Sequence, residues 1–409
     1  MNDELTSHLI RRFRGHTIPL QIFESTEAIS FFKEAGRKLT GYKLYTYQWD
    51  AIHGSSIIHS VTPAQIDMFS LLSREERDLL RTDPTCFWIF DYSMEGTSYK
   101  YYNWFKNIHD SAKKHNIPFY KIFFISSNLY EEIGYTEWCV SEKITEQINI
   151  VILDYWSTWF IQDHFKLEFS IDQTVDYIKN NKNKYFLSLN RRCREYRILT
   201  TFLIQQSRVV DRGLISADKP NYDEINNVKY LCKRAIDENK FDNYLDKLPL
   251  ILDRADFNVN WAWDNPSNLF SETMLSAVSE TLIDDWHGTS LFYSEKSFKP
   301  MKYNHPILIF GQPSANHQLE HIGFKKYDQY FNLNFDSISD PIDRVTAQIS
   351  ELERVCDELD RMSINGKIDW LLQDRDTLLY NKSQLTEQKF NKGKLTKLIH
   401  TMEKYRDIS

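Results

Sequence analysis

The residues best suited to chemistry gather first in an arginine-rich segment, YFLSLNRRCREYRILTTFL. An apolar run at 185–190 leads into a helical pattern that begins with four arginines: Arg191, Arg192, Arg194 and Arg197. From residue 182 to 197 there are six Lys or Arg and one Glu, a local net charge of +5. A helix N-terminus attracts anions, and a guanidinium can bind a phosphate through two parallel hydrogen bonds. The segment therefore predicts an anion site, and the alternative is a solvated basic helix end.

A second group of such residues lies between 276 and 311, where Glu280 ends an apolar run. Ser294, Glu295 and Lys296 then open a helix that we expect to end before Pro306. Ser294 suits the N-cap and Glu295 the first turn, whereas Lys296 is unfavourable there unless an anion lies nearby. A carboxylate at this place can accept both hydroxyls of a ribose, and the adjacent lysine can reach a diphosphate. The alternative is an ordinary capped helix with exposed charges.

Neither segment has the glycines of a P-loop, so an anion would be held by side chains. Short apolar runs that alternate with helical patterns must position these side chains. In the first half, 18–23, 43–48, 86–93, 119–128 and 148–157 are expected strands. Residues 25–39 and 63–81 are expected helices, the second with Pro63 near its first turn. Continuous apolar strands separated by helices indicate a parallel sheet covered on both faces, and hence an α/β domain.

The second half repeats this pattern. Strands are expected at 185–190, 208–216 and 305–311, and long helices from about 339 to 406. We predict two Rossmann-like α/β domains that face each other across a cleft, with ligands at the carboxyl ends of the strands. The predicted parts are an N-terminal domain at 1–178, a C-terminal domain at 179–380 and a basic C-terminal helix at 381–409.

Four short stretches of this region resemble the donor-site pattern of α1,3-fucosyltransferases and related glycosyltransferases of the GT-B fold. They are Glu280-Thr281, Tyr293-Ser294-Glu295-Lys296, Pro306-Ile307-Leu308 and Gly311-Gln312-Pro313. Ser188-Leu189-Asn190 with Arg194 or Arg197 resembles the strand end and arginine of that family. Glu295, Lys296, Lys299 and Pro300 are similar to a stretch found in phage-encoded glycosyltransferases. Ser279-Glu280-Thr281 stands where the family has Phe-Glu-Asn, so the donor base stays open.

The resemblance implies a GT-B enzyme that moves a sugar from a nucleotide-sugar donor to an acceptor hydroxyl. Donor binding is then expected of Arg191, Arg194, Arg197, Glu280, Ser294, Glu295, Lys296 and Lys299. Positive side chains would stabilise the leaving diphosphate without a metal, and no cofactor is expected because the nucleotide-sugar is a substrate. If the chain is phage-encoded, the acceptor could be a hydroxymethylated base in viral DNA flipped from its stack, and otherwise a glycan.

An inverting transfer requires a base for the acceptor proton, and whether the reaction inverts or retains stays open. Asp91 and Glu95, in IFDYSMEG after a first-domain strand, are the candidates, and an Asx turn with a solvent-facing Glu95 is the plain alternative. His53 and His59 are rival bases.

The composition of the chain argues against several other classes of protein. A net charge of −7 argues against a general nucleic-acid coat, although the stretch from Lys382 to Arg406, with seven Lys or Arg and two Glu, is basic. Five scattered cysteines indicate free thiols, and the charged start and the lack of a long apolar run favour the cytoplasm. Oligomeric state stays open. A non-catalytic nucleotide- or nucleic-acid-binding protein with a basic cleft is the alternative function.

Overall fold

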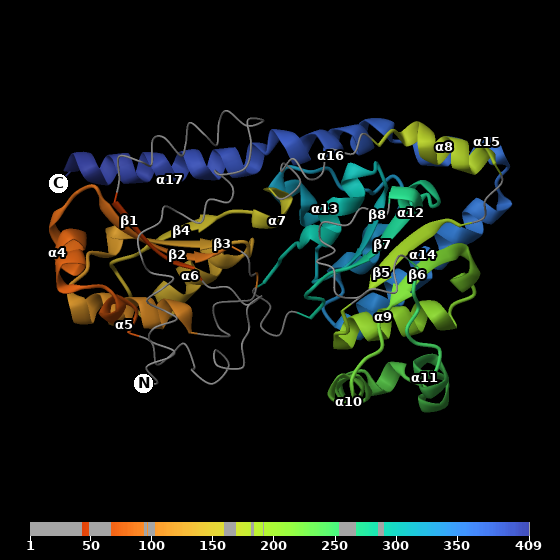
Figure 1. The fold of residues 1–409 in the computed structure, drawn as a ribbon, viewed down its shortest axis with the longest axis horizontal. Coiled ribbons are helices and arrows are strands. Elements are labelled where there is room, and N and C mark those ends of the chain that lie inside the picture. Colours follow the sequence, from red (N-terminus) through yellow and green to blue (C-terminus); the bar gives the residue numbers. More distant parts are fainter. Residues whose placement is uncertain are drawn as a thin grey trace. The chain divides into compact units, whose positions relative to one another are not determined.

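Two sheets of four parallel strands are the scaffold on which the helices pack (Figure 1). The structure is a computed structural model that describes residues 43–48, 67–93, 96, 103–158, 169–180, 184–190, 192–252, 267–284 and 290–408. Contacts divide the chain into two compact units. The first comprises Met1–Asp163, Trp286–Phe292 and Gln388–Ser409, and the second comprises His164–Asp285 and Tyr293–Glu387.

The sheet of the first unit has the strand order β1-β2-β3-β4, and each neighbouring pair is parallel. Its strands are β1 (Lys43–Gln48), β2 (Cys86–Tyr92), β3 (Ile122–Ser126) and β4 (Asn149–Ile152). All residues of β2 and β3 are buried, as expected of a parallel sheet with both faces covered. The strands predicted at 43–48, 86–93, 119–128 and 148–157 are therefore confirmed, the last three with shorter bounds. The strand and helix predicted at 18–23 and 25–39 lie outside the described residues.

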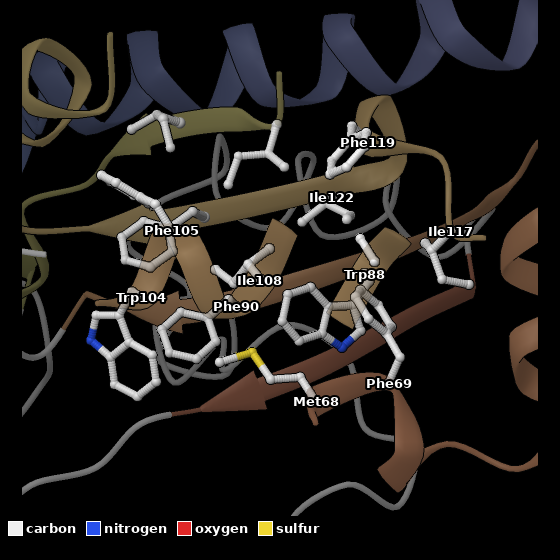
Figure 2. Packing of buried hydrophobic residues seen from close by; sticks show 14 of the residues in the cluster. Met68, Phe69, Trp88, Phe90, Trp104, Phe105, Ile108, Ile117, Phe119 and Ile122 are labelled. Carbon is white, nitrogen blue, oxygen red and sulfur yellow. The ribbon is translucent and has the colours of Figure 1, made fainter. Parts of the chain in front are cut away.

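Aromatic side chains dominate the core of this unit (Figure 2). The ring of Phe90 on β2 stacks on Phe124 of β3, with centroids 5.1 Å apart, and its centroid lies 4.7 Å from that of Trp104. Trp88 on β2 packs against Phe69 with centroids 4.8 Å apart. Such aromatic pairs add stability beyond the area that they bury, and they fix α5 (Trp104–His115) against the sheet.

The helix predicted at 63–81 is interrupted, which corrects the prediction. A short 3₁₀ helix, η2 (Met68–Leu71), is followed by α4 (Arg74–Thr82). The Ser73 hydroxyl accepts from the Glu76 amide and the Glu76 side chain accepts from the Ser73 amide, so a capping box starts a new helix. In the described residues before 160, the chain also forms η4 (Phe119–Lys121), α6 (Glu131–Ser141) and α7 (Tyr155–Thr158).

The sheet of the second unit has the order β6-β5-β7-β8, again with parallel neighbours. Its strands are β5 (Phe186–Asn190), β6 (Gly213–Ala217), β7 (Leu275–Ser279) and β8 (Ile307–Phe310). Strands were predicted at the places of β5, β6 and β8. β7 was not predicted as a strand, because LSAVS lacks aromatic residues and has a single β-branched one.

Helices surround this second sheet. They are α8 (Ile171–Lys179), α9 (Glu195–Gln206), η7 (Val210–Arg212), α10 (Tyr222–Leu231), η8 (Lys233–Ala235), α11 (Glu238–Leu245), α12 (Ser267–Ser271), α13 (Glu295–Lys302), η9 (Gln318–Ile322), η10 (Leu333–Ser337), α14 (Pro341–Arg361), α15 (Ile364–Leu372) and α16 (Arg375–Glu387). The units divide at 163/164 rather than at the predicted 178/179, since α8 packs on α12 and α15.

The last helix, α17 (Lys389–Ile408), belongs to the first unit. Asn391 anchors it, because its side-chain amide donates to the carbonyl of Asp154 and accepts from the amide of Asp154, both at 2.9 Å. The predicted boundary at 380/381 therefore lies within α16, and the units change at 387/388.

The α/β fold class with two parallel, Rossmann-like sheets is confirmed. The arrangement of the two units across a cleft stays a prediction. All five cysteines are free thiols, as the sequence indicates. Within the described part of the chain, no helix combines the length and the apolar character that crossing a membrane requires.

Candidate functional site

The carboxyl ends of β5 and β7 mark the place where the strand order of the second sheet changes direction. The chain runs from β5 to its neighbour β6 on one side, and β7 then lies on the other side of β5. In open parallel sheets, ligands bind outside the carboxyl ends of the strands at such a switch point. Asn190 ends β5 and leads to α9, while Glu280 follows β7 directly. The two segments selected from the sequence therefore meet at one edge of the sheet.

Arg197 on the first turn of α9 joins these two strand ends. Its guanidinium donates from Nε to the carbonyl oxygen of Glu280 at 3.0 Å and from Nη2 to Thr281 Oγ1 at 3.1 Å. Nη1 donates to the carbonyl oxygen of Arg192 at 3.4 Å. Burial, together with the charge of Arg194, lowers the pKa of Arg197 to about 10, so the side chain stays charged at neutral pH. A buried cation is thus held at the switch point.

Glu280 is fully buried and organises the start of α13. Its Oε1 accepts from the Ser294 amide at 3.0 Å and from the Ser297 hydroxyl at 2.6 Å. Its Oε2 accepts from the Ser294 hydroxyl at 2.6 Å and from the Thr281 amide at 2.9 Å. Four donors thus surround this carboxylate, and they connect the end of β7 with the N-terminus of α13.

Glu295 and Lys296 form an ion pair on the first turn of α13, with Lys296 Nζ 2.8 Å from Glu295 Oε1. Their side chains keep 19% and 17% of their surface exposed, which leaves both accessible to a small ligand. Burial lowers the pKa of Lys296, and the nearby Arg197 adds to this effect. Burial alone would raise the pKa of Glu295, but the charge of Lys296 and its hydrogen bond bring it below its usual range.

Thr281 is the residue on which the two cations converge, and it is not among the donor residues predicted from the sequence. Its Oγ1 accepts from Arg197 Nη2 at 3.1 Å and from Lys296 Nζ at 3.4 Å. Lys296 Nζ also donates to Ser294 Oγ at 3.2 Å. Thr281 follows Glu280 in the quoted motif, and this position was the only signal in the sequence.

The site at the carboxyl ends of β5 and β7 is positively charged. Two helices start there, and Arg194, the N-cap residue of α9, gives its first turn no capping side chain. Unpaired amides and the helix dipole at an N-terminus favour an anion. Four cationic and three acidic side chains of the site give a net charge of +1: Arg192, Arg194, Arg197 and Lys296, with Glu195, Glu280 and Glu295.

The other predicted donor residues lie as follows. Ser294 is the N-cap of α13, and Arg194 is exposed beside Arg197 at the start of α9. Lys299 is on α13 and is 8% exposed, one turn beyond Glu295 and Lys296. Arg191 lies outside the described residues. The structure thus brings together Arg194, Arg197, Glu280, Ser294, Glu295 and Lys296.

Of the two candidate bases, Asp91 is described and Glu95 is not. Asp91 is near the end of β2 and is 3% exposed, and its Oδ1 accepts from the Ser93 amide at 2.9 Å. This contact is the Asx turn that the sequence analysis left open. Burial raises the pKa of Asp91 to about 6, which suits a base at neutral pH. His53 and His59, the rival bases, also lie outside the described residues.

No protein-family model matches the chain, and no curated protein matches it. Among solved structures, the N-terminal domain of trehalose-6-phosphate phosphatase from Candida albicans is 10% identical, with a TM-score of 0.45 over 97% of this chain and 81% of that one. α,α-Trehalose 6-phosphate synthase from Burkholderia multivorans is 10% identical, with a TM-score of 0.42 over 91% and 74%. An E. coli trehalose-6-phosphate structure bound with UDP-2-fluoro glucose is also 10% identical, with a TM-score of 0.40 over 77% and 67%. With TM-scores below 0.5, these distant likenesses assign no activity to the chain.

Proposed function

We propose that the chain is a glycosyltransferase that binds a nucleotide-sugar at the carboxyl edge of its second sheet. The observation that carries the proposal is the convergence of Arg197 and Lys296 on Thr281, at the switch point between β5 and β7. A diphosphate needs positive charge and N–H donors that are already in place, and the starts of α9 and α13 supply both. The sequence resemblance to glycosyltransferase donor sites concerns these same residues.

Each side chain then has a distinct role toward the donor. Lys296, Arg194 and Arg197 bind the diphosphate and stabilise the charge that develops on it as the glycosidic bond breaks. Glu295 accepts the ribose hydroxyls, because its carboxylate is accessible and one oxygen is already oriented by Lys296. These roles require no metal ion, since the side chains carry the positive charge.

Glu280 acts differently from the role that the sequence analysis gave it. Its carboxylate accepts from Thr281, Ser294 and Ser297 and has no exposed surface. We therefore assign it to positioning the start of α13, and not to direct contact with the donor.

Asp91 is the proposed base that takes the proton of the acceptor hydroxyl. Its pKa, raised to about 6, keeps the carboxylate ionised at pH 7 yet more basic than an ordinary aspartate. The acceptor is a hydroxyl of a glycan or of a hydroxymethylated base in DNA, and these two substrates are distinguished by the test below.

The test measures release of nucleoside diphosphate from UDP-, GDP-, dTDP- and CMP-sugars, the last releasing the monophosphate. Each donor is incubated with oligosaccharides or with hydroxymethylated DNA, and mass spectrometry detects the added sugar. We expect turnover with one donor, its loss in Lys296→Ala, and its retention in Lys240→Ala, a matched change on exposed α11. Binding of a donor without turnover on any acceptor would favour the non-catalytic nucleotide-binding protein instead.

A further inference from the structure

The C-terminal helix α17 carries a row of exposed side chains, three of them lysines, that the donor site does not use. Six residues along one side of α17 are exposed: Lys389, Gly393, Thr396, Lys397, His400 and Lys404. Apart from the adjacent Thr396 and Lys397, successive members are three or four residues apart, which keeps them on one face of a helix. At a rise of about 1.5 Å per residue, the row from Lys389 to Lys404 is roughly 22 Å long. We call these six residues the α17 basic row.

The charge of α17 contrasts with that of the whole chain. Six Lys or Arg and two Asp or Glu between residues 389 and 408 give α17 a net charge of +4, whereas the chain has −7. Acidic side chains do face the row: Glu132 lies 3.4 Å from Lys397, and Glu403 lies 3.9 Å from His400. The exposed Asp407, three residues beyond Lys404, ends the same face and pairs with Arg406. Lys397 and His400 are nevertheless 60% and 81% exposed. Such exposed pairs are weak, so a phosphate can replace the carboxylate.

The opposite face of α17 is held in the first unit. Leu395, Leu398, Ile399 and Met402 are at most 6% exposed, and Asn391 is hydrogen-bonded to Asp154. A helix that binds a bilayer inserts its apolar face between the lipids. Since this face of α17 is already buried in protein, the row favours a partner that is recognised by charge alone.

Gly393 lies in the middle of the row, and packing against the described residues gives no reason for a glycine there. A Cβ built at this position meets no atom within 4 Å. Glycine in an exposed helix interior costs about 0.5–1 kcal/mol relative to alanine. Gly393 has no side chain and Thr396, one turn further on, has a short one. Between Lys389 and Lys397 the backbone of a bound polymer can therefore approach α17 closely.

A groove with aromatic walls adjoins the C-terminal end of the row. Tyr405 of α17 packs on Tyr120, with ring centroids 5.0 Å apart. Tyr120 also lines an open cavity of about 570 Å³ whose polar walls include Lys113, Asn116, Gln147 and one acidic residue, Glu146. Aromatic rings beside lysines are the combination that binds nucleotide bases and their phosphates.

We propose that the α17 basic row binds the phosphodiester backbone of a nucleic acid. Lys389, Lys397 and Lys404, spread over about 22 Å of helix, each face a phosphate, Gly393 and Thr396 admit the backbone, and the Tyr120 groove lies where a base can stack. Recognition is through charge and does not depend on base sequence. The surface lies in the first unit and is independent of the proposed donor site, so either proposal can fail without the other.

The experiment is a fluorescence-anisotropy titration of the full chain with a labelled 20-base-pair DNA duplex and the matching single strand, without nucleotide-sugar. It is repeated from 50 to 300 mM NaCl. The triple variant Lys389→Gln, Lys397→Gln, Lys404→Gln is expected to bind at least 10-fold more weakly at 50 mM. The slope of log K against log salt should shrink by about 2–3, since each lost phosphate contact removes about 0.9.

Two controls separate the row from net charge and from folding. Lys219→Gln, Lys233→Gln, Lys240→Gln removes the same charge from exposed positions of the second unit and should leave affinity and slope unchanged. Gly393→Leu should weaken binding several-fold while the melting temperature is unchanged or higher, because leucine favours helix. Equal losses in both triple variants, unaltered binding in Gly393→Leu, or tighter binding to anionic phosphatidylserine vesicles than to either DNA would overturn the proposal.

Discussion

The guanidinium Nε of Arg197 donates to the backbone carbonyl oxygen of Glu280 at 3.0 Å. This contact joins the first turn of α9 to the end of β7 across 83 positions of sequence. The side chain of Glu280 in turn accepts from Ser294 at the start of α13. A chain of hydrogen bonds thus fixes the two helix N-termini relative to each other, and with them the cations that the proposed donor requires.

Arg197→Lys tests this link. A single ammonium cannot reach Glu280, Thr281 and Arg192 at once, so buried acceptors lose their donors. We expect urea unfolding to show a loss of about 1–3 kcal/mol, and calorimetry to show at least 10-fold weaker donor binding. Arg194→Lys, at an exposed position, is the control and should keep full stability. Equal stability of the two variants would show that the Arg197 contacts hold nothing together.

Two isosteric substitutions separate positioning from donor binding. Glu280→Gln replaces one carboxylate oxygen by an amide that faces the donors of Ser294, Ser297 and Thr281, so the protein should unfold at lower temperature. Glu295→Gln loses the charge that faces Lys296 but keeps an oxygen that can accept from its ammonium, so it should lower the melting temperature less than Glu280→Gln and should weaken donor binding. Thermal denaturation and calorimetry of both variants are the measurements. The reverse pattern would exchange the two assignments.

The raised pKa of Asp91 predicts that lowering the pH decreases activity but increases the stability of the fold. Because its pKa is raised from 3.8 to about 6, kcat/KM should fall as the pH drops below 6 and the carboxyl gains a proton. The raised pKa also means that the protonated form stabilises the folded state. That stability, about 3 kcal/mol, is full below pH 3.8 and is lost as the pH rises through 6.

Asp91→Asn checks both effects, since asparagine stays neutral and can still accept from the Ser93 amide. At pH 7.5 the variant should bind the donor, lack turnover, and unfold at higher urea than the wild-type protein. Full turnover in the variant would remove Asp91 from the reaction. A lower urea midpoint at pH 7.5 would show that the ionised carboxylate stabilises the fold instead.

His305 predicts acid sensitivity of the second unit. It is 1% exposed, its Nδ1 lies 3.0 Å from the Ser276 hydroxyl and its Nε2 lies 2.7 Å from the Phe270 carbonyl oxygen. Burial lowers its pKa to about 4, so the unfolded chain takes up a proton at a higher pH than the folded one. The resulting stability, about 3 kcal/mol, is present above pH 6.5 and is lost as the pH falls to 4. Urea unfolding of His305→Gln should show a flatter dependence between pH 6.5 and 4, and identical curves would contradict the assignment.

The sequence predicted more of the strands than of the contacts between them. Aromatic and β-branched runs such as CFWIFDY identify β2 by themselves. β7, with the sequence LSAVS, becomes a strand because β5 and β8 pair with it on either side. The interruption before α4 was visible in the Ser73–Glu76 capping box, but the longer apolar pattern favoured one helix.

The candidate site was predictable as two separate segments, because helix starts with cations suggest an anion locally. That the two segments form one site could be seen only from the strand order of the second sheet. This order places β7 beside β5, although β6 lies between them in the sequence. Glu280 shows the limit of this reasoning. The resemblance to glycosyltransferase donor sites implied that Glu280 binds the donor, whereas its complete burial among four hydrogen-bond donors supports the positioning role that we propose.

Thermal unfolding with millimolar UDP-, GDP-, dTDP- or CMP-sugar tests the proposed donor site most directly. A ligand that binds only the folded state raises the melting temperature, and binding at 100 times Kd adds about 2.7 kcal/mol. We predict a rise of a few degrees with one nucleotide-sugar for the wild-type protein and Lys240→Ala, and none for Lys296→Ala. No rise with any of the four donors, or an equal rise in Lys296→Ala, would contradict a nucleotide-sugar site at the β5–β7 switch point.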